Sequence, residues 1–538
     1  MDLLLTSLGI LPIILVLILM GIFNMPAKKV MPIAAVIAII IAIIFWKMPM
    51  DWLFASIADG TLTALDIMLI VIGALLLIEI MKKSKRINVI IANLKSISKD
   101  SRVQLVIIGW AFVCFLEGIA GFGTPTAIVA PLLVALGYPT VAAVAIPLMF
   151  DTAPTTFGAV GVPISYGIPT AIPGISEAIL RETAIYSAML HSIVALFLPL
   201  AAILILTRFF TKEKSWKLGF DATAFAFVGS ISFIIPYTLT AIYIGPELPS
   251  IIGAITALII IIIFAKKKWL MPKKEWHFDL EKSIDEKVHK HISEKGIEVN
   301  LKSTLIAWLP YFMVAIILII TRIKSLGIYD LIRKVTITVP ELFGTTITYN
   351  NFILYHPGTI FIIIAIISSI IFKMQTKEVV ESFYSTFRKL VPAIITLIFT
   401  IILVKVLLNS GNAGMKSMLI IPAEALAGMV GVAWYAVAPF IGSLGSFISG
   451  SNTVSNILFS ALHEGIANDL GRNLALLLAL QAVGGAVGNM ICIHNIVAGC
   501  STVGIAGQES KILRVTLIPS LIYASIIGIV GMILILMI

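Results

Sequence analysis

Long apolar stretches recur along the whole chain, and each is close to the length that crosses a bilayer. A spanning α-helix needs about 20 consecutive apolar residues. The runs that reach or approach this length are 8–23, 30–46, 62–80, 184–206, 250–265, 305–320, 359–372, 390–407 and 515–538. The 538 residues are 59% hydrophobic and only 12% charged, whereas a soluble domain carries about 25% charged residues. We therefore expect an all-α polytopic protein of the cell membrane with about 12–14 transmembrane segments.

The formal net charge of +10 comes from basic residues in short connections between apolar runs, which does not indicate nucleic-acid binding. Lys and Arg concentrate in the cytoplasmic loops of membrane proteins. Counting crossings, the basic clusters at 28–29, 82–102, 208–217 and 266–268 all fall on one side, which we predict to be cytoplasmic. The four basic residues within 322–334 fall on the predicted outer side, against this rule.

One long polar insert, 266–302, separates two apolar halves. We predict a cytoplasmic connector between an N-terminal membrane repeat, 1–265, and a C-terminal membrane repeat, 303–538. Its Lys- and Glu-rich composition is typical of a solvated amphipathic segment. The insert also contains His277, His289 and His291, but a solvated connector is favoured over a metal site, and we expect neither a metal nor a cofactor.

Both halves contain breaks rich in small residues inside apolar sequence. The first breaks are 117–126, which includes Thr-Pro-Thr, and 444–453, which ends in Ser-Asn-Thr. Second breaks follow at 151–161 and 484–500. About three spans precede each first break, so the second half enters the membrane from the opposite side. This predicts inverted repeats with broken or re-entrant helices, provided that 418–429 is not a full crossing, which the sequence leaves open.

Irregular backbone at membrane depth survives only where protein or a wet cavity satisfies its polar groups, so the breaks predict the binding site. Helix amino ends suit a carboxylate because they present N–H donors and a partial positive charge. Small-residue helix packing is the alternative, but packing alone requires neither Thr-Pro-Thr nor Ser-Asn-Thr. The candidate substrate-binding residues are Gly123, Thr124, Thr126, Ser451, Asn452, Thr453, Asn456 and Asn489.

Three titratable residues at the breaks are candidates for proton coupling. Glu117 lies about 20 Å along its helix if that helix begins near residue 103, and a carboxyl inside the hydrocarbon suggests function by default. Asp151 and His494 are further candidates. The alternatives are a protonated Glu117 that caps nearby amides, Asp151 as a helix N-cap, and a neutral buried His494. Ser451 with His494 could imitate a hydrolase pair, but no surrounding motif supports an enzyme.

These breaks resemble the signatures of the bacterial and archaeal L-lactate permease family, in segments 115–128, 442–456 and 488–498. The resemblance spans nearly the whole chain. It implies proton-coupled uptake of lactate, with glycolate and related 2-hydroxy monocarboxylates as further substrates. The family is similar to the wider ion-transporter superfamily, which implies inverted repeats, re-entrant hairpins and a scaffold that often forms a homodimer.

Two positions depart from the patterns of those relatives. Asp151 stands where Asn is usual in the family, and Thr124-Pro125-Thr126 stands where sodium–dicarboxylate relatives carry a second Ser-Asn-Thr. One fewer amide fits a monocarboxylate better than a dicarboxylate. The alternatives that remain are a sodium-coupled organic-anion carrier of the same architecture and, from other classes, an intramembrane enzyme or a passive anion channel.

Overall fold

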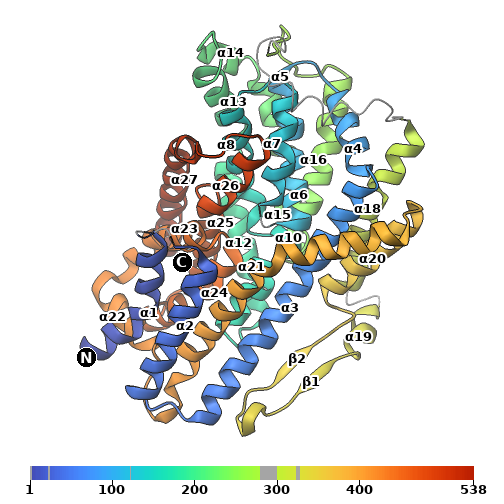
Figure 1. Ribbon diagram of the computed structural model, residues 1–538. Coiled ribbons are helices and arrows are strands. Elements are labelled where there is room, and N and C mark those ends of the chain that lie inside the picture. Colours follow the sequence, from blue (N-terminus) through green and yellow to red (C-terminus); the bar gives the residue numbers. More distant parts are fainter. Residues whose placement is uncertain are drawn as a thin grey trace.

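The computed structural model describes residues 3–21, 23, 25–121, 123–278, 300–322 and 327–537, and helices dominate it (Figure 1). Within these residues, ten helices are long and apolar enough to cross a membrane, or up to twelve if each of two bent pairs is one span. The prediction of a helical polytopic membrane protein is therefore confirmed, and the higher count, twelve, meets the lower end of the predicted range of about 12–14. The described strands, β1 (Ile337–Val339) and β2 (Tyr349–Asn351), pair antiparallel with Ile337 opposite Asn351.

One bundle combines helices from the start of the first half with helices from the start of the second. Its helices are α1 (Leu3–Gly21), α2 (Ala27–Ile44), α3 (Met50–Lys83), α4 (Arg86–Lys95), α18 (Leu301–Arg322), α20 (Pro357–Ile371) and α21 (Thr376–Asn409). Small residues allow α3 to approach its neighbours closely. A Cβ on Gly73 would lie 2.5 Å from the carbonyl oxygen of Gly358 in α20, and a Cβ on Gly60 would lie 2.9 Å from the backbone of Ile402 in α21.

A buried ion pair joins α3 to α21. Lys405 Nζ lies 2.9 Å from Asp59 Oδ2, and the two side chains are only 9% and 11% exposed. At the other end of the same helices, Lys83 pairs with Glu381. The Asp59–Lys405 pair was not predicted from the sequence, because each charge stands alone at the edge of an apolar run and the two are far apart in the chain.

A second bundle contains both sets of predicted breaks. From the first half it takes α5 (Ser101–Gln104), η1 (Leu105–Phe112), α6 (Val113–Ala120), α7 (Thr124–Ala135), α8 (Thr140–Phe150), α9 (Thr152–Thr155), α10 (Gly158–Val162), η2 (Pro163–Gly167), α11 (Ile168–Ala171), α12 (Glu177–Ala195), α13 (Leu198–Phe209), α14 (Trp216–Phe220), α15 (Thr223–Tyr243) and α16 (Pro249–Lys266). From the second half it takes α23 (Trp434–Ser449), α24 (Asn452–Leu470), α25 (Leu474–Asn489), α26 (Ile493–Thr502) and α27 (Glu509–Met537).

Each half of this bundle contains a helical hairpin followed by a broken helix. We call α6–α7 hairpin 1 and α23–α24 hairpin 2. Hairpin 1 turns at Gly121 and Gly123 and hairpin 2 at Gly450 and Ser451, all inside the predicted first breaks. The broken helices are α8–α11, interrupted from Asp151 onward, and α25–α26, interrupted between Asn489 and Ile493. The repeated order is the one predicted from the sequence, whereas the boundaries 1–265 and 303–538 stay predictions.

The segment left open by the sequence, 418–429, forms a short helix, α22 (Ile420–Val430). Eleven residues extend about 16 Å, roughly half of the hydrocarbon thickness, so α22 alone is too short to cross. It leads through η7 (Gly431–Ala433) into α23.

The two ends of the molecule differ in their connections. Figure 1 shows α5 and α14 at one end and the β hairpin at the other. The predicted basic cluster at 208–217, between α13 and α14, and Arg102 of α5 lie at the α5–α14 end. Of the predicted connector, residues 279–299, with His289 and His291, lie outside the described residues, as do 323–326.

Arg333 is one of the four basic residues within 322–334 that conflict with the positive-inside rule. It lies at the end of α19 (Ile328–Arg333), before the β hairpin, with η5 (Leu342–Gly344) at the hairpin tip. Its guanidinium lies over three aromatic rings, 4.4 Å from the ring centre of Phe352, 5.0 Å from Tyr329 and 5.6 Å from Tyr355. The charge is thus engaged in cation–π contacts within this outer segment.

The crossing of α23 and α25 generates a prediction about stability. A Cβ on Gly484 would lie 2.2 Å from the carbonyl oxygen of Pro439, and overpacking of this kind costs about 1–3 kcal/mol. We expect Gly484→Ala to lower the unfolding temperature of the purified protein in detergent by several degrees. Gly428→Ala, in α22 where no atom lies within 4 Å of the new Cβ, is the matched control. Equal unfolding temperatures for the two variants would contradict the close crossing.

Candidate functional site

The two hairpin tips and the two broken helices meet at one polar cavity. The space between its lining atoms amounts to about 280 Å³, including open solvent. Its lining combines both halves of the chain: Glu117, Gly121, Thr155, Gly158, Ala159, Pro163, Gly450, Ser451, Asn452, Thr453 and Asn489. The predicted meeting of the breaks is therefore what the structure shows.

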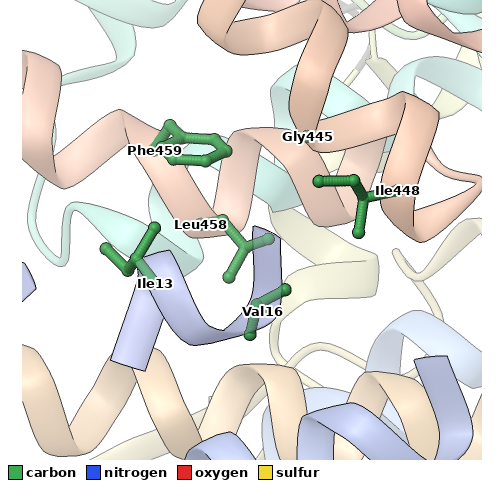
Figure 2. Close-up of a pocket in the computed structure, with 6 residues that line it drawn as sticks. All are labelled: Ile13, Val16, Gly445, Ile448, Leu458 and Phe459. Atoms are coloured by element: carbon green, nitrogen blue, oxygen red, sulfur yellow. The ribbon is translucent and has the colours of Figure 1, made fainter. Parts of the chain in front are cut away.

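A second pocket has no polar side chain that could bind an anion. It lies between α1 and hairpin 2, as Figure 2 shows. The residues that line it are Ile13, Val16, Gly445, Ile448, Leu458 and Phe459. This pocket is an apolar packing seam, and the candidate site is the polar cavity.

The tip of hairpin 2 presents a helix amino end to the cavity. Gly450 adopts a left-handed conformation (φ 78°) that turns the chain, and Ser451 then caps α24 because its Oγ accepts from the Val454 amide at 3.4 Å. The first helical amides, those of Asn452 and Thr453, have no acceptor within the helix. Together with the positive end of the helix dipole, they can hold a carboxylate.

The Asn452 side chain adds polar groups at this tip. It is 3% exposed, and neither its Oδ1 nor its Nδ2 has a hydrogen-bond partner among the described residues. A Cβ on Gly485 would lie 2.0 Å from Asn452 Oδ1, so the glycine leaves room for the amide. Because an unpaired buried polar group costs about 1–3 kcal/mol, this amide is well placed to bind a polar ligand.

Glu117 enters the cavity from hairpin 1. It lies in the last turns of α6 and is 2% exposed. Gly158, in the first broken helix, makes room for the carboxyl group, since a Cβ there would lie 2.4 Å from Glu117 Oε1. The carboxyl group of Glu117 is thus buried inside the bundle, as predicted, and packs closely against Gly158.

Asp151 is the direct neighbour of Glu117. The two carboxyl groups are close enough to share a hydrogen bond, and Thr155 also lies beside Glu117. Glu117 Oε2 and both carboxyl oxygens of Asp151 have no protein donor among the described residues. No described ion pair links either residue to Lys or Arg. Two paired carboxyl groups without a basic partner are a site that can bind a proton.

Side chains from other helices satisfy the irregular backbone of the first broken helix. Tyr237 donates to the carbonyl oxygen of Ala153 (2.9 Å), Ser250 to that of Pro154 (2.8 Å), and Asn456 Nδ2 to that of Pro163 (2.9 Å). Such pairing is required where backbone carbonyls are freed at membrane depth. Asn456, predicted to bind substrate, thus joins hairpin 2 to the broken helix of the other half.

The remaining predicted residues lie around the cavity without lining it. Gly123 (φ 73°) packs on Asn495, since a Cβ there would lie 2.6 Å from Asn495 Oδ1. Thr124 begins α7, and Thr126 is buried facing Gly499 of α26. His494 is exposed beside Gly450. Their roles in binding or proton coupling stay predictions.

The residues whose hydrogen bonds hold the first broken helix in place were not predicted from the sequence. They are Thr156, His191, Tyr237, Ser250 and Tyr523. The only available signal was that His191 is a lone titratable side chain inside the apolar run 184–206. Nothing in the sequence indicated its partners, because they lie 35 and 332 residues away.

Comparisons with known proteins identify the family of this chain. The family model described as L-lactate permease matches residues 6–538. The L-lactate permease of Escherichia coli K12 is 31% identical, covering 92% of this chain and 89% of the relative. That of Salmonella typhimurium is 30% identical with the same coverage. The glycolate permease GlcA of Escherichia coli K12 is 29% identical over 97% of this chain and 94% of its own length.

Two solved transporter structures show a weaker likeness. The YdaH transporter of Alcanivorax borkumensis matches with a TM-score of 0.42 and 12% identity, covering 86% of this chain and 84% of that one. MtrF of Neisseria gonorrhoeae, described as belonging to a class of antimetabolite efflux pumps, matches with the same TM-score and identity, covering 87% and 81%.

The geometry of the hairpin 2 tip predicts the effect of one substitution on ligand binding. Asn452→Ala removes two unpaired polar atoms of a residue that lines the cavity, and each hydrogen bond that they could form with a ligand is worth about 1 kcal/mol. We expect the dissociation constant of the purified protein for a small carboxylate such as lactate to rise by about tenfold or more, measured by isothermal titration calorimetry. Ser460→Ala, on the same helix at a buried hydroxyl without a described partner, should leave it unchanged. Unaltered affinity in Asn452→Ala would contradict the assignment.

Proposed function

We propose that this chain, which belongs to the L-lactate permease family, is a secondary transporter that imports lactate or a related 2-hydroxy monocarboxylate together with a proton. It is a multi-pass protein of the cell membrane. The observation that carries the proposal is a single cavity lined by a helix amino end and by the carboxyl group of Glu117, which has Asp151 beside it. The first can hold an anion, and the second can hold the proton that accompanies it.

The substrate class rests on the chemistry of the cavity lining and on the relatives. A helix amino end binds one carboxylate, and the nearby hydroxyl and amide groups of Ser451, Asn452 and Asn489 can hydrogen-bond the 2-hydroxyl group. Relatives named for lactate and for glycolate align over nearly the full chain. Both compounds are 2-hydroxy monocarboxylates, so we propose the class rather than one acid.

The proton assignment rests on the charge balance of the cavity. Glu117 and Asp151 are adjacent and form no described ion pair with Lys or Arg, so a substrate anion would add a further negative charge beside them. A bound proton offsets that charge. One anion with one proton moves without net charge, and each unit of pH difference then supplies about 1.4 kcal/mol, or about tenfold accumulation.

The enzymatic alternative gains no support from the site. Among the described residues no hydrogen bond joins Ser451 to His494, and Ser451 Oγ is engaged as the cap of α24. The relatives carry the name permease. We therefore propose transport as the function of this cavity.

The direct test uses purified protein in proteoliposomes with radiolabelled lactate. We expect accumulation when the outside is acidic and the inside is neutral, at about tenfold per pH unit, and no dependence on sodium. Uptake that needs a sodium gradient and ignores pH would contradict proton symport and favour the sodium-coupled alternative. Uptake that never exceeds equilibrium under either gradient would indicate a passive channel.

Substitution of Glu117 in the same assay tests the proton site. Glu117→Gln keeps the shape of the side chain but cannot carry a proton between states, so we expect gradient-driven accumulation to fall to the equilibrium level while lactate exchange persists. Glu275→Gln, at an exposed carboxyl beyond α16, is the control. Normal accumulation in Glu117→Gln would show that Glu117 does not carry the coupled proton.

A further inference from the structure

His191 is a buried titratable residue that the proposed transport step does not use. It lies in α12 with no exposed surface and hydrogen-bonds through both ring nitrogens. Its Nε2 lies 2.7 Å from Thr156 Oγ1, and its Nδ1 lies 2.7 Å from the Tyr523 hydroxyl in α27. A lone histidine in an apolar run therefore has a complete set of partners from two distant segments.

The donor and acceptor roles of these bonds follow from the chemistry of the partners. Thr156 Oγ1 donates its proton to the carbonyl oxygen of Ala482 at 3.3 Å, so it accepts from His191 Nε2–H. His191 Nδ1 then accepts from the Tyr523 hydroxyl. In this arrangement the imidazole is neutral, and one chain of hydrogen bonds runs from α27 through α12 to α25.

A second buried histidine, His463, is bonded in a different way. The indole N–H of Trp434 can only donate, so it fixes His463 Nδ1 as an acceptor at 2.9 Å. His463 Nε2–H then donates to Gln481 Oε1 at 2.9 Å, and Gln481 Nε2 donates to Ser455 in hairpin 2. His463 thus supports hairpin 2, whereas His191 supports the broken helix of the first half.

Thr156 lies in the strained segment that places Asp151. In this segment Ala159 and Val160 have positive φ values of 44° and 60°, which non-glycine residues adopt only when surrounding contacts enforce them. Thr155, the neighbour of Thr156, donates to the carbonyl oxygen of Asp151. Thr156 links this segment to the second half of the chain in two ways. It bonds directly to Ala482 in α25, and through His191 it is linked to Tyr523 in α27.

We infer that His191 is a positioning residue for proton coupling: through Thr156 it holds the segment that carries Asp151 against α25, so that Asp151 meets Glu117. The inference rests on the proposed function. His191 does not line the cavity and contacts no substrate. The rings that face it are those of Tyr237 and Tyr523, with centres 6.5 and 5.9 Å away, and the described ion pairs do not involve it.

The test separates coupling from folding by measuring two activities of each variant in proteoliposomes. One is lactate accumulation driven by a pH gradient, and the other is exchange of internal for external lactate without a gradient. For His191→Phe and for Thr156→Val we expect accumulation to fall by about tenfold while exchange stays within about twofold of the wild type. Because both substitutions break the same hydrogen bond, the double variant should be no worse than either single variant.

Ser187→Ala is the matched control, since Ser187 is buried on α12 one turn before His191 and its hydroxyl has no described partner. It should keep both activities. Thr156→Val preserves side-chain shape and keeps the test open if His191→Phe does not fold. Accumulation and exchange that fall in parallel would reduce His191 to a structural role and overturn the inference, as would unchanged accumulation. If the wild type itself fails to accumulate lactate under a pH gradient, the proposed function fails instead.

Discussion

The structure depends on one constraint, that backbone polar groups at membrane depth must be paired inside the protein. Breaks in the helices would be costly unless other side chains reached them. Here Tyr237, Ser250 and Asn456 donate to the carbonyls freed by the first broken helix, and Ser451 caps the helix that follows the second tip. The breaks can therefore exist, and they leave helix amides available for a ligand at the center of the bundle.

The same constraint brings opposite chemical features together. Hairpin 2 contributes a helix amino end that favours an anion, and hairpin 1 contributes Glu117 beside Asp151. Asn456 connects hairpin 2 to the broken helix of the first half, and Thr156 connects that broken helix to α25. The tip proposed to bind the anion and the broken helix that carries Asp151 are thus joined by a direct hydrogen bond, which offers a physical basis for the proposed coupling.

The breaks and the residues within them were predictable because their signals are local. Glycines, hydroxyls and a single Glu inside an apolar run mark Glu117 and the segment 451–453, and all of these line the cavity. The supporting residues were not predictable, because their roles depend on partners far away in the sequence. His191 needs Tyr523, and Asp59 needs Lys405 in a helix of the other half. Helices formed at the apolar runs, but α3 and α21 begin well before runs 62–80 and 390–407, and run 184–206 is divided between α12 and α13. The division into bundles did not follow the two halves, since α3 packs on α20 and α21.

The most direct test of the central claim is an experimental structure of the protein with bound lactate, determined by electron cryomicroscopy in a lipid nanodisc. The account predicts density for the acid in the cavity between the hairpin tips, with its carboxylate against the amides of Asn452 and Thr453 and Glu117 on the facing wall. Density for lactate at any other place, or lactate bound with these two amides paired to protein instead, would contradict it.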